Sequence, residues 1–146
     1  MAFLQERMAA EGRFPRLQQA LTAPGDDVHA EVFGIVEELY DTLAANRITI
    51  RLINAAARDL PELGELWFDG ARQGLHDNLT AYLDARVAAG ALSAPPSTAA
   101  AARMLIESTI WFAVHRAWDA RPDGIPDELV RATLSAGLAR SLTGDP

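Results

Sequence analysis

Histidines and carboxylates are the side chains of this sequence that could catalyse a reaction or hold a metal. His29, His76 and His115 lie far apart in the chain, and neither an HExxH pair nor another metal-ligand spacing joins them. No serine stands in a nucleophile elbow, and no glycine-rich phosphate loop is present. Cysteine is absent, which excludes thiolate catalysis and Cys-ligated metals. We therefore expect no enzyme, no metal site and no cofactor.

A small-molecule site is the other chemistry that the residues suggest, and it centres on Glu107 and His115. These polar residues stand two helical turns apart in an apolar segment, with Trp111 between them. In a functional reading they are polar fixtures of an aromatic-lined cavity. In a structural reading, which we prefer for these two residues, Glu107 pairs with Arg103 or Arg51 and His115 lies at a core edge.

Aromatic residues and two mid-helix glycines extend this candidate site. Aromatic residues at helical spacing are more often simple core residues than ligand contacts. The two mid-helix glycines near Trp67 favour a cavity instead. Each glycine costs about 1 kcal/mol inside a helix, and that cost is tolerated more easily where a neighbouring helix or a bound molecule needs the space. The predicted ligand-binding residues are Phe33, Tyr40, Arg51, Trp67, Gly70, Ala71, Gly74, Met104, Glu107, Trp111 and His115.

Residues 97–120 form the element that must position much of this site. The segment lies between two proline-containing turns, and Ser97 or Thr98 can cap its start. As one helix it would be about 36 Å long. It is apolar nearly all round, so its own chain or a second copy must cover it. Charged residues at 103, 107 and 116 interrupt the run of about 20 apolar residues that a membrane span needs.

Apolar periodicity predicts the other elements, and all of them are helices. Residues 47–53 alternate like a strand, but a lone strand would have no partner for its backbone groups. We therefore interpret 46–58 as a helix. The fold class is all-α with about six helices, and these span 3–21 (broken near Gly12 and Pro15), 27–45, 46–58, 59–89 (ended by Gly90), 97–120 and 126–142.

Length and charge restrict the domain count and the partners. The 146 residues fit one domain, 1–146, and no signal segment opens it, so we expect a cytoplasmic protein. The net charge is −7, every basic residue except histidine is arginine, and the arginines are scattered. Holding nucleic acid needs clustered basic residues, so this chain by itself should not bind DNA.

The order of several short motifs resembles the C-terminal domain of TetR-family transcriptional regulators, over nearly the whole chain. No single motif is diagnostic, and the resemblance rests on their order and spacing. The motifs are Ala44-Ala45-Asn46-Arg47, Asp59-Leu60-Pro61-Glu62-Leu63 with Trp67-Phe68, Tyr82-Leu83-x-x-Arg86-x-x-x-Gly90-x-Leu92, and Glu107-x-x-x-Trp111-Phe112-Ala113-Val114-His115-Arg116 followed by Trp118-Asp119.

This resemblance implies a regulatory domain that senses a ligand and dimerises, in a regulator that we expect to be a repressor. Its last two long helices would pack with those of a second copy into a four-helix bundle, and a small, largely apolar effector would occupy a cavity among the middle helices. The implied homodimer interface comprises Ile106, Ile110, Ala113, Ala117, Val130, Leu134, Gly137, Leu138 and Ser141.

The family's helix-turn-helix domain has no counterpart in this sequence, because residues 1–22 resemble the connecting helix onward. We expect either a truncated chain or a DNA-binding part outside it, so DNA would be bound only through that N-terminal domain. An alternative function is a stand-alone helical carrier for an apolar molecule. A helical-bundle enzyme would need clustered carboxylates or histidines on facing helices, and the sequence places none there.

Overall fold

The computed structural model of the protein describes residues 14–144, apart from the side chains of residues 66–69. Within this part the chain forms seven α-helices and no strand, so the all-α prediction is confirmed and one more α-helix is present than expected. The elements are α2 (Pro15–Thr22), α3 (Val28–Ala45), α4 (Arg47–Ala56), α5 (Pro61–Gly64), the π-helical segment η1 (Glu65–Arg72), α6 (Gln73–Ala88), α7 (Thr98–Ala113), the 3-10 turn η2 (His115–Trp118) and α8 (Asp127–Thr143).

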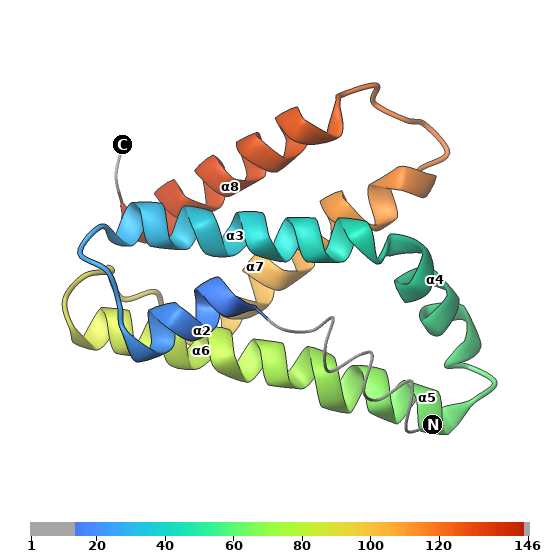
Figure 1. The fold of residues 1–146 in the computed structure, drawn as a ribbon, viewed down its shortest axis with the longest axis horizontal. Coiled ribbons are helices and arrows are strands. Elements are labelled where there is room, and N and C mark those ends of the chain that lie inside the picture. The colour runs from blue at the N-terminus through green and yellow to red at the C-terminus, as the bar shows by residue number, and fades with distance from the viewer. Residues whose placement is uncertain (1–13, 145–146) are drawn as a thin grey trace.

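Helix α3 runs through the middle of the molecule, with α8 beside it and α7 crossing behind (Figure 1). Asp27 caps its first turn by accepting a hydrogen bond from the Ala30 backbone N–H at 2.9 Å. The apolar residues whose periodicity predicts this helix point into the core, and Val32, Val36 and Leu39 are at most 1 % exposed. The capped helix therefore supplies the core against which the other helices pack.

Charged groups fasten α3 to its neighbours at the borders of this core. Arg131 of α8 forms a fork on Asp41, with Nε and Nη2 each 2.7 Å from a carboxylate oxygen. At the other end of α3, Glu31 accepts a hydrogen bond from the Tyr82 hydroxyl at 2.7 Å. Arg86, which is 7 % exposed, approaches the same carboxylate at 3.2 Å. Paired in this way, charges can lie at a core edge without the full penalty of desolvation.

The helix predicted over 59–89 is found as one continuous helical run whose middle is wider than an α-helix. A π-helical segment, η1, separates α5 from α6, which explains the additional helix. Such segments are rare and are frequent at functional sites. The run ends as predicted at Gly90, which has a φ of 73°. The Ala91 N–H bonds to the Arg86 carbonyl and the Gly90 N–H to the Val87 carbonyl, the pattern of a Schellman motif.

The prediction of one helix over 97–120 is wrong at its C-terminal end. Ser97 caps the start as expected, accepting a hydrogen bond from the Ala100 N–H at 3.1 Å. However, the α-helix stops at Ala113, and η2 continues the chain with a tighter pitch. In this turn Arg116 is directed to the loop before α8, where it forms a fork on Asp123 with contacts of 2.8 and 2.7 Å. No proline or glycine marks the break, so periodicity alone extends the helix too far.

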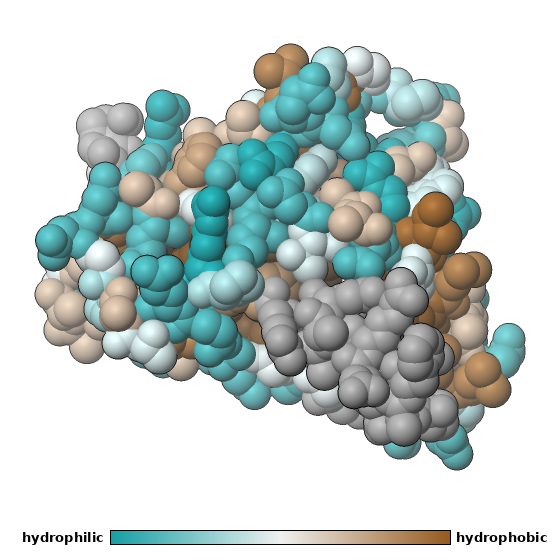
Figure 2. Space-filling model, in the orientation of Figure 1, coloured by the Kyte–Doolittle hydropathy of each residue, from teal (hydrophilic) through white to brown (hydrophobic). Residues whose placement is uncertain are grey.

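Helix α4 confirms the helical interpretation of residues 46–58, but only part of its apolar surface is covered. Ile50 and Ile53 are buried, whereas Ile48 is 67 % and Leu52 64 % exposed. Figure 2 shows apolar atoms gathered on the side of the molecule where α4 and α5 lie. No helix in the described part of the chain is long and apolar enough to cross a membrane.

Two glycines allow a test of this helical run. A Cβ added at Gly74 would meet no atom within 4 Å, and the residue lies inside α6. We expect Gly74→Ala to raise the free energy of unfolding by about 0.5–1 kcal/mol, because alanine loses less backbone entropy in a helix. Gly90→Ala is the matched control and should lower it by about 1 kcal/mol, because its φ is positive. Urea denaturation followed by circular dichroism measures both, and equal shifts would contradict this assignment.

Candidate functional site

Two arginines converge on one carboxylate where the π-helical segment meets α7. Arg72, the last residue of η1, donates from Nη2 to Oε1 of Glu107, and Arg103 Nε lies 2.8 Å from the same oxygen. Arg103 and Glu107 stand four residues apart on α7, so their side chains meet by helical geometry. The pairing with Arg103 was one of the two alternatives from the sequence, whereas Arg72 was not predicted. No sequence pattern relates residue 72 to residue 107.

Arg51, the other alternative partner of Glu107, lies elsewhere. Its guanidinium carbon is 4.5 Å from the ring centroid of Trp118, a cation–π contact between α4 and η2. The Glu107 site is partly open to solvent, since the side chains of Arg72, Glu107 and Arg103 are 25 %, 41 % and 52 % exposed. It is therefore accessible to a molecule in solution.

Apolar side chains flank Glu107 along α7. Met104 precedes it by three residues and Trp111 follows it by four, which places all three on one face of the helix. Met104 is 68 % and Trp111 45 % exposed. The Trp111 ring makes an edge contact with Phe112, with the centroids 5.0 Å apart. The structure thus brings together three of the predicted ligand-binding residues, with a charged centre and apolar surface on both sides.

The other predicted ligand-binding residues lie apart from this face or are not described. Tyr40 is 2 % exposed in the core, and Phe33 is half-buried against that core. A Cβ at Gly70 or Gly74 would meet no atom within 4 Å, and Ala71 is exposed, so no helix of the described residues 14–144 occupies that side. His115 is exposed on η2. The Trp67 side chain lies outside the described part of the structure.

The hydroxyl of Tyr40 is a buried polar group for which the described residues supply no hydrogen-bond partner. Burial raises the pKa of Tyr40, and the negative charge of Asp127 raises it further. Tyr40 is therefore neutral at physiological pH and lies close to the start of α8, rather than on the face that carries Glu107.

The histidines make separate contacts. Nε2 of His76 is 3.0 Å from the carbonyl oxygen of Ala99, and Nδ1 of His29 is 3.4 Å from Oγ1 of Thr143. Among the described residues, no three histidine or carboxylate side chains group so that they could hold a metal ion.

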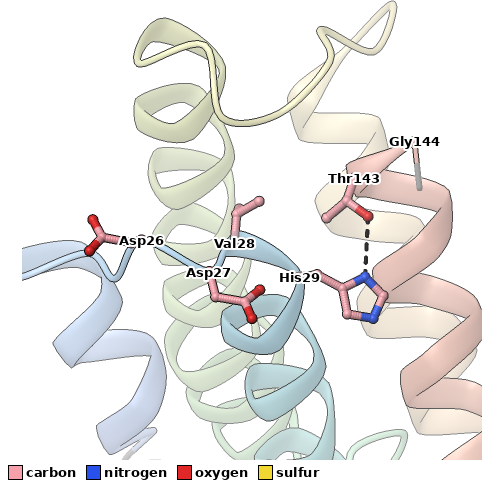
Figure 3. Close-up of a pocket in the computed structure, with 6 residues that line it drawn as sticks. All are labelled: Asp26, Asp27, Val28, His29, Thr143 and Gly144. Atoms are coloured by element: carbon pink, nitrogen blue, oxygen red, sulfur yellow. Dashed lines mark hydrogen bonds between the residues drawn. The ribbon is translucent and has the colours of Figure 1, made fainter.

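A surface pocket lies at the start of α3 and the end of α8 (Figure 3). None of the predicted ligand-binding residues lines it. One of its carboxylates, that of Asp27, already caps α3. The pocket is open, and the His29–Thr143 contact spans it between the two helices. The lining residues are Asp26, Asp27, Val28, His29, Thr143 and Gly144.

A second charged cluster joins η2, the following loop and the start of α8. Arg116 Nη1 lies 2.8 Å from Asp127, and Arg47 of α4 lies 3.0 Å from the same carboxylate. The Arg116 guanidinium holds the pKa of Asp123 at about 2, and the Arg47 guanidinium lowers the pKa of Asp127. In the sequence, Arg116 stands out only as a charge that interrupts the apolar run of residues 97–120. The Pro-Asp-Gly turn that follows was the available signal for a carboxylate partner.

The residues predicted for a dimer interface divide into three groups. Ile106, Ala113 and Val130 lie in the core of the chain itself, while Ile110, Leu134 and Leu138 are half-buried against that core. Ala117, Gly137 and Ser141 are exposed. On α8, Gly137 and Ser141 continue a row of exposed residues that begins with Leu129 and Thr133, each four residues after the last. The interface itself remains a prediction.

Comparison with known proteins finds one family. Residues 41–139 match the family model described as the C-terminal domain of AefR-like transcriptional repressors. This range contains the two arginines, Glu107 and most of α8. No curated protein and no solved structure matches the chain.

The Arg116 cluster predicts how stability depends on pH. The pKa of Asp123 is about 2 in the folded chain against an ordinary value of 3.8, so its stabilising effect is complete above 3.8 and is lost as the pH falls through 2. The melting temperature of the wild type should exceed that of Asp123→Asn at pH 5, and the difference should shrink as the pH falls and vanish below pH 2. Asp59→Asn, at an exposed carboxylate outside this cluster, is the control. A constant difference between pH 5 and pH 2 would exclude this role for Asp123.

Proposed function

Because the chain belongs to the C-terminal domains of AefR-like, TetR-family transcriptional repressors, we propose that it senses a small effector and forms a homodimer within a repressor. The family consists of regulators rather than enzymes. In this proposal DNA is bound by a separate helix-turn-helix domain, and effector binding changes how two such domains are held. Such a regulator acts in the cytoplasm, where the DNA is.

The observation that carries the homodimer is the exposed row on α8. Leu129 is 56 % exposed, and a Cβ at Gly137 would meet no atom of the chain within 4 Å. Residues four apart in a helix form one ridge, and small residues in it allow a second helix to approach closely. Closed two-fold symmetry would bring the same row of a second copy against it. A helix of a second copy would cover the exposed Leu129 side chain and fill the space beside Gly137.

The observation that supports effector sensing is the surface around Glu107. It combines a charged centre with the exposed apolar side chains of Met104 and Trp111, and it is attached to the π-helical segment. Sites for small molecules commonly pair apolar surface with a few polar groups that fix orientation. We propose that a small, largely apolar effector binds there.

Gly137→Arg tests the homodimer without a change in the core of the chain. The space beside Gly137 is empty in one copy, so the arginine can be accommodated there, whereas in a dimer it would be buried unpaired. We expect the dimer dissociation constant to rise roughly a hundredfold or more. Sedimentation velocity over a concentration series measures it, with melting temperature as the check on folding.

Gly74→Arg is the matched control, because Gly74 is also an exposed glycine inside a helix with no atom near its Cβ position. It should leave the dimer intact. A wild-type chain that is monomeric at micromolar concentrations would refute the homodimer. Native mass spectrometry of the same samples tests the effector, since a co-purified small molecule would appear as additional mass on the dimer.

A further inference from the structure

We propose that Arg72 and Arg103 form the anion-binding end of the effector site, and that the effector is a small amphiphilic carboxylic acid. In this assignment, which rests on the proposed function, Glu107 occupies the place of the effector's carboxylate while no effector is bound. The effector's carboxylate takes over the two guanidinium groups, and its apolar body lies along α7.

The charges favour an anion over a cation. The guanidinium groups of Arg72 and Arg103 meet at one carboxylate oxygen of Glu107, in a chain whose net charge is −7. Arg103 Nε lies 2.8 Å from Glu107, and among the described residues the two terminal nitrogens of Arg103 donate no hydrogen bond. Guanidinium groups bind carboxylates with paired, charge-assisted hydrogen bonds. An ammonium group would have to approach two cations and compete with both for Glu107.

The position of Arg72 on the π-helical segment influences which carboxylic acids can displace Glu107. Arg72 is held on the π-helical segment and is only 25 % exposed, so its charge is partly shielded from water. Electrostatic attraction at such a position exceeds that between fully exposed groups. The effector's carboxylate has to displace Glu107, so only part of its electrostatic attraction to the two guanidinium groups adds to the affinity. The rest of the affinity must then come from apolar contact, which selects acids that have an apolar body.

Apolar contact is available next to the charges. Met104 and Trp111 stand on either side of Glu107 on the same face of α7, and both are exposed. Met104 is unbranched and adapts to different shapes, while Trp111 offers a broad apolar surface. An acid anchored at Arg72 and Arg103 can therefore lay an alkyl or aryl body against either residue.

Binding in this way would also release a link between two elements. Among the described side chains, Glu107 joins α7 to the π-helical segment through Arg72. When an effector takes Arg72, α7 and η1 are held together by the effector instead of by Glu107. The occupancy of the site is then coupled to the relative position of the two elements.

The test compares head groups on one body. Phenylbutyrate, phenylbutanol and phenylbutylamine are titrated into the purified protein by calorimetry and tryptophan fluorescence, together with the corresponding hexyl and decyl acids, alcohols and amines. We expect the acids to bind at least about tenfold more tightly than the alcohols, and the amines more weakly still. Arg72→Gln and Arg103→Gln should each weaken acid binding about tenfold and leave alcohol binding unchanged.

Glu107→Gln separates the exchange from a merely structural ion pair. Removing the competing carboxylate should tighten acid binding several-fold, even if the melting temperature falls. Arg58→Gln is the matched control, because Arg58 is an exposed arginine just after the C-terminal end of α4 and is not part of this cluster. It should leave acid binding and alcohol binding unchanged. Circular dichroism and sedimentation check that each variant is folded and has the oligomeric state of the wild type.

Three outcomes of these binding experiments would overturn the proposed carboxylic acid effector. Equal binding of acids and alcohols, unaffected by Arg72→Gln, would show an apolar effector site without the anion end and would leave the proposed function intact. Preferred binding of the amines would assign the opposite charge to the effector. If no compound of any set binds, the carboxylic acid effector is refuted. The homodimer is judged separately by sedimentation of the unliganded chain.

Discussion

The structure depends on the burial of α3 along nearly its whole length. Val32, Ile35, Val36 and Leu39 are each at most 3 % exposed, and fully burying such side chains contributes about 1.5–3 kcal/mol apiece. A helix that is covered on most sides needs several neighbours, and α2, α7 and α8 all pack against it. The core is thereby completed within one chain, and only the outward faces of the other helices remain available for binding.

The outward faces have different characters because their neighbours differ. On α7, Glu107 lies at the centre of the free face, with the exposed apolar side chains of Met104 and Trp111 on either side of it. On α8 the free row is small or apolar, with a leucine at one end and a glycine towards the other. The charged face of α7 can bind a small molecule that has a polar group, whereas the row of small and apolar residues on α8 can pack against another helix. This difference underlies the separate proposals for effector binding and for dimerisation.

Helix α4 is attached to the rest of the chain largely by arginines at one end. Arg47 pairs with Asp127 at the start of α8, and Arg51 lies over Trp118 in η2. Its outer apolar residues, Ile48 and Leu52, remain exposed. Ion pairs at the surface contribute less than apolar burial, so α4 is held less firmly than α3. The segment from η2 to the start of α8 therefore also holds α4 in place, through Trp118 and Asp127.

The sequence by itself determined the helical class, the family and most helix boundaries, because each rests on local periodicity, capping residues and the order of motifs. Asp27, Ser97 and Gly90 mark helix ends through contacts with residues a few positions away. Only the tertiary structure decided which residues meet across the fold. Arg72 and Glu107 are 35 residues apart, and nothing local relates them. The break after Ala113 has the same origin, since long-range contacts of η2 override a pattern that would continue the helix.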